Sequence, residues 1–273
     1  MKTILRTGLG MLILAVVLTA ASTLLMRAYA ATGAVTGAVT GNTSALVSSE
    51  SRPLETGIVN VVLSGPIDLE LKRGDTPHML IKGDANMLPR VTSRVEGNTL
   101  YLGTRGIIVL IRQPLKVELS LPALEKLQTQ GSGDSQVSGF HGSRLELSVT
   151  GSGDLGFDGN YQQVQARSSG SADIALNFTQ LDSLELVLQG SGDARLKGQA
   201  KVLNLKLSGS GDLYASAMKA KQVSVFSSGS SEVQVFAEQA ITVRALGSGN
   251  TTIYGKPAKR MIERSGSGEI SWQ

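Results

Sequence analysis

The chain has 273 residues and no cysteine, and 41% of its residues are hydrophobic but only 4% are aromatic. Without thiols it can form neither disulfides nor thiolate metal sites, and it cannot be lipidated at an N-terminal cysteine. Most of the formal charge of +4 comes from residues 1–30, which hold three of the 26 basic residues and no acidic residue. The remainder carries 23 basic against 22 acidic residues, a net charge of +1. A nearly neutral chain without clustered Lys or Arg argues against nucleic acid as a partner.

Residues 1–30 predict a secretory signal peptide. Lys2 and Arg6 precede an apolar run from about residue 7 to residue 26, and Ala28-Tyr29-Ala30 supplies a small-residue cleavage pattern. An uncleaved anchor is the alternative, because the run is almost long enough to span a bilayer. We therefore expect an exported protein, in the periplasm, at the outer-membrane surface or secreted, or else anchored to the membrane by its N-terminus.

Residues 31–53 are rich in Ala, Thr, Gly and Ser without an amphipathic period, which predicts a flexible low-complexity linker. Residues 54–273 are predicted to form one folded domain. It begins with alternating apolar residues around Ser64-Gly65-Pro66-Ile67-Asp68, which looks like a diverged first copy of a unit that recurs later. Residues 72–121 are irregular and carry hairpin signals such as Glu96-Gly97-Asn98-Thr99.

The regular part, residues 124–273, is organised around the tetrapeptide Gly-Ser-Gly-Asp. Its eight copies, intact or slightly changed, begin at Gly131, Gly151, Gly170, Gly190, Gly209, Gly229, Gly247 and Gly266, with gaps of 20, 19, 20, 19, 20, 18 and 19 residues. Such a period is typical of stacked repeat proteins.

Apolar residues alternate with polar residues on both sides of each copy, which predicts two half-buried strands in each repeat. Two strands of this length cannot bury an apolar face alone, but stacked copies can. The predicted fold is therefore all-β: a parallel β-solenoid of two-strand repeats of about 19 residues, with a hairpin-rich N-terminal portion. A sandwich or barrel of hairpins is the alternative, but it would not require so constant a period.

The tetrapeptide is predicted to form the corner between the two strands. The four intact copies of the motif supply these corner residues: Gly131, Ser132, Gly133, Asp134; Gly151, Ser152, Gly153, Asp154; Gly190, Ser191, Gly192, Asp193; and Gly209, Ser210, Gly211, Asp212. The glycines would permit the sharp corner and the serines would hydrogen-bond between levels. The column of acids would cap the turns as Asx-type acceptors. Calcium binding is the alternative for the acids, although the repeat length differs from that of calcium-binding nonapeptide repeats.

Three aromatic residues, Tyr214, Phe236 and Tyr254, fall at outward positions of the strand that follows the corner in three consecutive repeats. Exposed rings on a β-face can stack on sugars or pack against a partner, so these three residues are the predicted binding residues. Chance placement of three aromatics is the alternative. Trp272 falls at an inward position in the last repeat, where we expect it to cover the end of the core.

The order of motifs resembles a bacterial family described as putative auto-transporter adhesin, head GIN domain. The resemblance rests on residues 67–75 (Ile-Asp-Leu-Glu-Leu-Lys-Arg-Gly-Asp), Gly83-Asp84-Ala85-Asn86, Glu96-Gly97-Asn98-Thr99-Leu100 and the Gly-Ser-Gly-Asp array, and it covers residues from about 57 to 273. It implies a β-solenoid of the cell envelope and supplies no catalytic residues.

Together these features predict an exported, non-enzymatic, adhesin-like module of the envelope that presents flat β-faces to an envelope polysaccharide or protein. No cofactor and no metal site are expected. The first alternative is a structural scaffold that self-associates through solenoid ends or faces, giving a homo-oligomer. A polysaccharide-active β-helix enzyme is the second alternative, but it needs a groove with paired carboxylates, and the regular carboxylates here lie in the corners.

Overall fold

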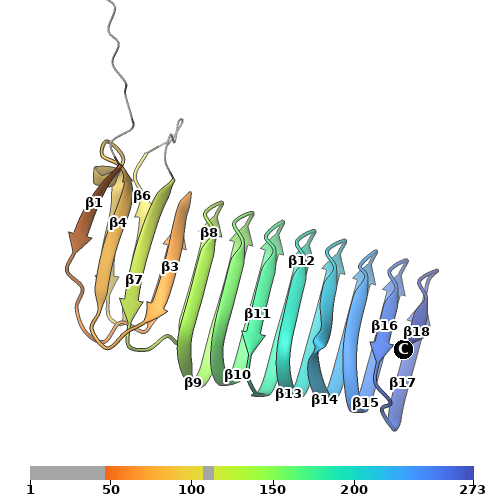
Figure 1. Cartoon of the computed structure of the whole chain (residues 1–273). Helices are drawn as coiled ribbons and strands as arrows, with labels where there is room; N and C mark the ends of the chain where they lie inside the picture. The colour runs from red at the N-terminus through yellow and green to blue at the C-terminus, as the bar shows by residue number, and fades with distance from the viewer. Residues whose placement is uncertain (1–46, 107–113) are drawn as a thin grey trace, which may run out of the picture. The chain divides into compact units, whose positions relative to one another are not determined.

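The computed structural model of the chain describes residues 47–106 and 114–273, and these residues form almost entirely β-strands (Figure 1). The predicted signal peptide and the predicted linker up to residue 46 lie outside the described residues. One 3-10 turn, η1 (Leu88–Arg90), interrupts the strands. In the described ranges, no helix of the length and apolar character needed to cross a membrane is present.

The strands fall into a cap and a series of coils. The strands outside the regular repeats are β1 (Val47–Arg52), β2 (Asn60–Ser64), β3 (Ile67–Arg73), β4 (His78–Asp84), β5 (Val91–Glu96), β6 (Thr99–Thr104) and β7 (Leu115–Leu121). The regular coils contain β8 (Lys126–Gly131), β9 (Ser135–Gly151), β10 (Leu155–Gly170), β11 (Ile174–Phe178), β12 (Leu181–Gly190), β13 (Ala194–Gly209), β14 (Leu213–Gly229), β15 (Val233–Gly247), β16 (Thr251–Tyr254), β17 (Lys259–Ser265) and β18 (Ile270–Trp272).

Successive coils pair in parallel and in register, which confirms the predicted parallel β-solenoid. The corner glycines mark the register, because each lies opposite the next along the stack: Gly131, Gly151, Gly170, Gly190, Gly209, Gly229 and Gly247. Each coil contributes one strand before its corner and one after it. We call the surface made by the strands after the corners face A, and the surface made by the strands before them face B.

Both faces alternate between buried and exposed side chains, as strands with one buried side do. The inward residues of the two faces share one aliphatic core. Leu186, Leu205 and Val225, for example, occupy equivalent positions in successive coils and are almost fully buried. This shared core explains why two strands of a coil are stable only in a stack.

The second corner of the coil, about eight residues after the first glycine, is less regular. Strands β9, β10, β13, β14 and β15 continue through it, and their pairing shifts register there, for example between Asp158 and Gly159. Such bulges bend a strand from one face to the other.

The order of coils at the N-terminal end differs from the order of the sequence. Gly65 lies directly beneath Gly131, because β2 pairs with β8 and β3 pairs with β9. Strands β6 and β7 lie on the other side of β2 and β3. Strands β6 and β7 therefore form an outer layer beside β2 and β3, although β8 follows them in the sequence.

Antiparallel strands complete this end. Strand β4 pairs antiparallel with β7 and with β1, while β5 pairs antiparallel with β6. The hairpin character predicted for residues 72–121 thus describes a cap on the parallel stack. Because β1 occupies Val47–Arg52, the folded part begins before residue 54, and the predicted linker of residues 31–53 extended too far. The residues of β1 show no clear alternation of apolar and polar side chains, so the sequence did not reveal this strand.

Trp272 lies opposite the buried Ile253, at the inward position that the sequence predicted. It is 39% exposed, as a residue in the last coil is when no further coil packs on it. The Arg260 guanidinium lies 4.3 Å from the centre of the indole ring and covers it in place of another coil. Arg260 itself occupies an inward register position, opposite Ile241. A charged residue at such a position discourages edge-to-edge association of strands.

Candidate functional site

The first glycine of each corner is required for both conformation and space. At Gly209 φ is +133°, a region that side chains disfavour, and a Cβ atom there would lie 2.1 Å from the carbonyl oxygen of Gly190 in the neighbouring coil. The same contact recurs at the other corners of the array. The predicted role of these glycines in the corner follows from this close backbone approach.

The serines at the second position point to solvent. Their backbone N–H groups make the contacts between levels: the N–H of Ser152 donates to the Gly131 carbonyl at 3.0 Å, and the N–H of Ser210 to the Gly190 carbonyl at 2.9 Å. In the described repeats, one side-chain bond joins two members of the column, Ser191 to Ser171 at 3.4 Å. The expectation that serine hydroxyls satisfy the corner is therefore wrong for most levels, where the backbone does so.

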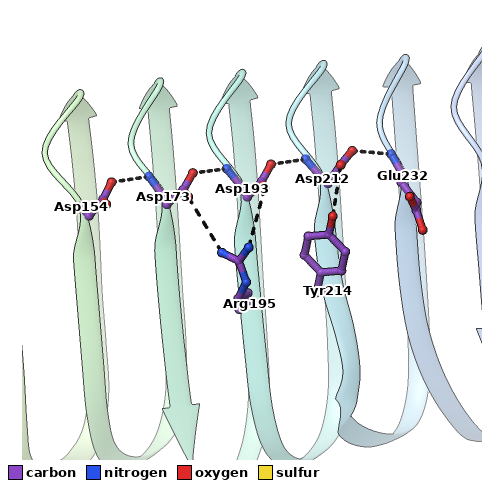
Figure 2. Close-up of polar contacts among 7 residues, drawn as sticks. All are labelled: Asp154, Asp173, Asp193, Arg195, Asp212, Tyr214 and Glu232. Atoms are coloured by element: carbon purple, nitrogen blue, oxygen red, sulfur yellow. Dashed lines mark hydrogen bonds and ion pairs between the residues drawn. The ribbon is translucent and has the colours of Figure 1, made fainter.

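The acids at the fourth position form a ladder of hydrogen bonds between coils (Figure 2). The carboxylate of each acid accepts a bond from the backbone N–H of the acid in the next coil; Asp212 donates to Asp193 at 2.9 Å and Glu232 donates to Asp212 at 2.7 Å. The unbroken series, which we call the acid ladder, runs through Asp68, Asp134, Asp154, Asp173, Asp193, Asp212 and Glu232. The acids thus cap the following coil rather than their own turn.

This geometry explains how a column of like charges persists. A carboxylate that accepts a backbone N–H is stabilised in its charged form, which offsets repulsion between levels about 4.8 Å apart. Asn250 fits the same scheme with its side-chain oxygen, which accepts the N–H of Glu269 at 2.9 Å. In the described ranges, no group of three or more His, Asp or Glu side chains is placed to hold a metal ion.

Arg195 and Tyr214 connect the acid ladder to face A (Figure 2). The guanidinium lies 3.8 Å from Asp173 and 3.9 Å from Asp193, and it also lies 5.3 Å from the Tyr214 ring centre. The Tyr214 hydroxyl donates to Asp212 at 3.3 Å, and the negative charge of Asp212 raises the pKa of Tyr214. The cation of Arg195 is therefore partly neutralised by the ladder beside it.

The three predicted binding residues all lie half-exposed on face A, but not in one row. Phe236 and Tyr254 lie directly opposite each other on β15 and β16. Tyr214 lies in the neighbouring outward row, opposite Gln234. Because side chains two positions apart along a strand occupy different rows, the three rings form a diagonal patch rather than a ladder.

Face B carries a row that the sequence analysis missed. Phe226 lies between Lys206 and Arg244 on adjacent coils, with the charged groups 6.0 and 5.9 Å from the ring centre. The signal was present in the sequence, since all three residues stand three positions before a corner glycine. The aromatic pattern is less evident there, because this row holds a single ring.

Two hollows lie at the edges of the regular array. One, of about 510 Å³, is lined by Asp68, Glu70, Lys116, Gln136 and other residues at the start of the acid ladder. Glu70 is paired with Lys116 at 2.6 Å and with Lys72, and these partners hold its pKa at about 2. Such a carboxylate is a poor general base or acid near neutral pH, where catalysis needs a pKa close to the working pH.

The other hollow, of about 440 Å³, lies at the second corner and is lined by Lys126, His141, Arg144, Glu146, Tyr161 and neighbouring residues. The Tyr161 hydroxyl donates to the Leu124 carbonyl at 2.6 Å, and burial raises the pKa of the phenol. Lys126 pairs with Glu146 at 3.0 Å. The phenol and this ion pair thus have structural partners already.

A model of the family described as putative auto-transporter adhesin, head GIN domain, matches residues 59–257. Several crystal structures share the fold, including three from Parabacteroides species. A putative lipid binding protein from Parabacteroides distasonis is 24% identical with a TM-score of 0.74, over 83% of this chain and 96% of that one. A putative adhesin from the same species is 21% identical with a TM-score of 0.78, over 84% of this chain and 98% of that one. A putative adhesin from Parabacteroides merdae is 19% identical with a TM-score of 0.77, over 83% of this chain and 96% of that one. No protein of curated function matches the sequence significantly.

Proposed function

We propose that this chain, which belongs to the family described as putative auto-transporter adhesin, head GIN domain, is an exported, non-enzymatic binding module of the cell envelope. The observation that supports this is the arrangement of outward side chains. On both faces they repeat from coil to coil in rows that mix rings, cations and neutral polar groups. A surface with one repeating spacing suits an extended ligand, such as a glycan or a protein segment, better than a small substrate.

The sequence-predicted patch on face A is one place for such contacts. Tyr214, Phe236 and Tyr254 would offer ring surface to sugars or to a partner protein. Phe236 also lies 6.0 Å from the Lys219 ammonium group, so the patch combines aromatic surface with positive charge.

A binding measurement tests the function and the patch separately. The purified chain would be titrated against immobilised envelope polysaccharide and envelope protein fractions, and compared with a variant in which Tyr214, Phe236 and Tyr254 are replaced by Ala. The control is Gln239→Ala, which removes an exposed side chain at the second corner, away from the outward rows of both faces. Loss of binding in the triple variant supports the face A patch, whereas unchanged binding excludes it. Absence of binding to every fraction contradicts the proposed function.

A self-associating scaffold is the second candidate, because the last coil exposes large apolar side chains. Met261 and Ile262 are 68% and 42% exposed, and Trp272 lies in the same coil. Association through this end would cover them. Light scattering of the purified chain over a wide concentration range would give a mass that rises with concentration, while a constant monomer mass would contradict this candidate.

A further inference from the structure

We infer that face B binds an acidic polysaccharide in which charged and neutral sugars alternate, with the chain of sugars running along the solenoid axis. The inference rests on the proposed binding function and specifies its ligand and its surface. The surface is the outward row three positions before the corner glycines, which we call the basic row. Its central members are Arg167, Val187, Lys206, Phe226 and Arg244; Gln128 and Ser148 precede them in the row, and Glu263 follows Arg244.

The strand register places these five residues side by side in consecutive coils. Arg167 lies opposite Val187, Val187 opposite Lys206, Lys206 opposite Phe226, and Phe226 opposite Arg244. Parallel strands lie about 4.8 Å apart, so a cation occurs every second coil, or roughly every 9.6 Å. Between the cations lie one aliphatic and one aromatic side chain.

Two of the three cations of the basic row, Arg167 and Lys206, are available to a ligand. Arg167, Lys206 and Arg244 are all exposed. Within the described residues, neither Arg167 nor Lys206 has a carboxylate within ion-pair distance, and Arg244 pairs with Glu263 at 3.4 Å on the side away from Phe226. On face A, Arg195 lies between two carboxylates of the acid ladder, at 3.8 and 3.9 Å.

Phe226 offers a ring surface at a defined place in the row. Its side chain is half-buried, and the cations of Lys206 and Arg244 approach it from the coils on either side. Cation–π contacts of this kind restrict the ring, so little side-chain freedom is lost when a ligand packs on it. A neutral sugar can place its apolar C–H face on such a ring.

The flanking rows complete a surface suited to sugar hydroxyls. One flank consists of hydroxyl and amide side chains over four coils, followed by Leu246 beside Arg244: Ser169, Gln189, Ser208, Ser228 and Leu246. The other flank is similar except for one acid: Gln165, Glu185, Asn204, Ser224 and Thr242. The hydroxyl and amide groups both donate and accept hydrogen bonds. The charge of the surface is therefore concentrated in the basic row.

The spacing selects the kind of acidic polymer. A sugar ring in an extended chain is close in length to one coil spacing, so successive sugars would lie over successive coils. Acidic sugars would then meet Arg167, Lys206 and Arg244, and neutral sugars would meet Val187 and Phe226. A polymer with a carboxylate on every sugar would place a carboxylate over these apolar side chains. That carboxylate would lose hydration without gaining a cation as a partner, which weakens binding.

Other polyanions fit this surface less well. Nucleic acids carry a phosphate on every nucleotide and are bound by denser clusters of Lys and Arg. An anionic bilayer attracts polybasic segments or an apolar face that enters the interface, and the basic row has three separated cations and one half-buried ring. We therefore commit to the alternating acidic polysaccharide and treat the others as outcomes of the test.

The test measures affinity of the purified chain for defined probes at near-physiological salt. Hyaluronan oligosaccharides represent an alternating uronate and neutral amino sugar, polygalacturonate carries a carboxylate on every sugar, and chitin oligosaccharides carry none. Single-stranded DNA and vesicles of anionic phospholipid are included as other polyanions. We expect hyaluronan to bind most tightly at equal carboxylate concentration.

Two variants and one matched control locate the site. Lys206→Gln should weaken hyaluronan binding about five-fold, the effect of losing one exposed charge contact. Phe226→Leu keeps apolar surface but removes the ring, and it should weaken binding about three-fold. Lys197→Gln changes the same charge on the same strand β13 but on face A, and it should leave binding within two-fold of the unmodified chain.

The outcomes separate this inference from the proposed function. Equal effects of Lys206→Gln and Lys197→Gln, equal binding of polygalacturonate, or equally tight binding of DNA or vesicles would overturn the inference. Binding to envelope polysaccharide without binding to hyaluronan would also overturn it but would leave the proposed function in place. Failure to bind any glycan or envelope protein would refute both.

Discussion

Replacing Asp193 with Ala would remove the acceptor for one bond of the acid ladder. The side chain of Asp193 accepts the backbone N–H of Asp212 at 2.9 Å, and this part of the corner is half-buried. Leaving a buried N–H without a partner costs about 1–3 kcal/mol, and partial access of water places this site near 1 kcal/mol. The exposed contact with Arg195 at 3.9 Å adds little.

Asp193→Asn is the matched variant, because it removes the charge and retains an acceptor oxygen. Asn250 already performs this role in another coil. We expect its effect to stay within about 0.5 kcal/mol of zero, since it also relieves repulsion between neighbouring carboxylates. The comparison therefore separates the hydrogen bond from the charge.

Amide hydrogen exchange is the suitable assay, because a stack of coils need not unfold in a single two-state step. Asp193→Ala should speed exchange of the Asp212 amide about five-fold, which corresponds to about 1 kcal/mol. The amide of residue 193 itself donates to Asp173 and should be unchanged, so it serves as an internal control. Unchanged exchange at Asp212, or equal acceleration by Asp193→Asn, would refute the reasoning.

Three further predictions follow from the corners and the cap. Gly209→Ala should destabilise the fold by roughly 3 kcal/mol or more in urea unfolding, because φ is +133° and the new Cβ would lie 2.1 Å from a carbonyl oxygen. The control Gly156→Ala should change stability by less than about 1 kcal/mol, because the new Cβ meets only the flexible end of a side chain. Similar losses of stability in the two variants would contradict this account. In the described residues, the backbone N–H of Asn250 makes no bond of the acid ladder to Glu232. Glu232→Asp should shorten the side chain enough for its carboxylate to accept this N–H, and hydrogen exchange of the Asn250 amide should become slower. Faster exchange of that amide would count against this prediction. The ion pairs that lower the pKa of Glu70 to about 2 contribute stability above pH 4.5, and this stability is lost as the pH falls toward 2. The melting temperature of Glu70→Gln should therefore depend less on pH across this range than that of the unmodified chain. An unaltered dependence of the melting temperature on pH would exclude the effect.

The period of the corner motif was sufficient to predict the solenoid. Eight glycines at a constant spacing impose one backbone geometry on every coil, and the two-residue alternation around them identifies the inward side chains. These are local signals that each coil repeats. The positions of Leu186 and Leu205 in the core could therefore be read without a structure.

The arrangement of the cap could not be read in the same way. The contact between Gly65 and Gly131 joins residues 66 positions apart, and nothing local indicates that β6 and β7 form an outer layer beside β2 and β3. Pairing between distant strands depends on which partner buries more surface, which a single sequence does not express.

The acid ladder was predicted in composition but not in connectivity. A column of Asp residues in turns suggests capping, but whether each acid bonds within its own turn or to the next coil depends on the offset between coils. Asn250 was the informative exception, because an amide can replace the carboxylate as an acceptor. The residues of the basic row stand at a fixed distance from the corner glycines in the sequence, but only the strand register shows that Phe226 lies between two cations.

The acid ladder also makes the coil a unit by which the protein can change length. Each bond joins an acid to the coil that follows it, so every rung has the same polarity and any coil with Asp or Asn at this position can be stacked on any other. Duplication or loss of a whole repeat of 18–20 residues would keep the corners in phase, whereas loss of half a repeat would move inward residues to the surface. Both faces would then lengthen or shorten in steps of about 4.8 Å while the corner geometry stays the same.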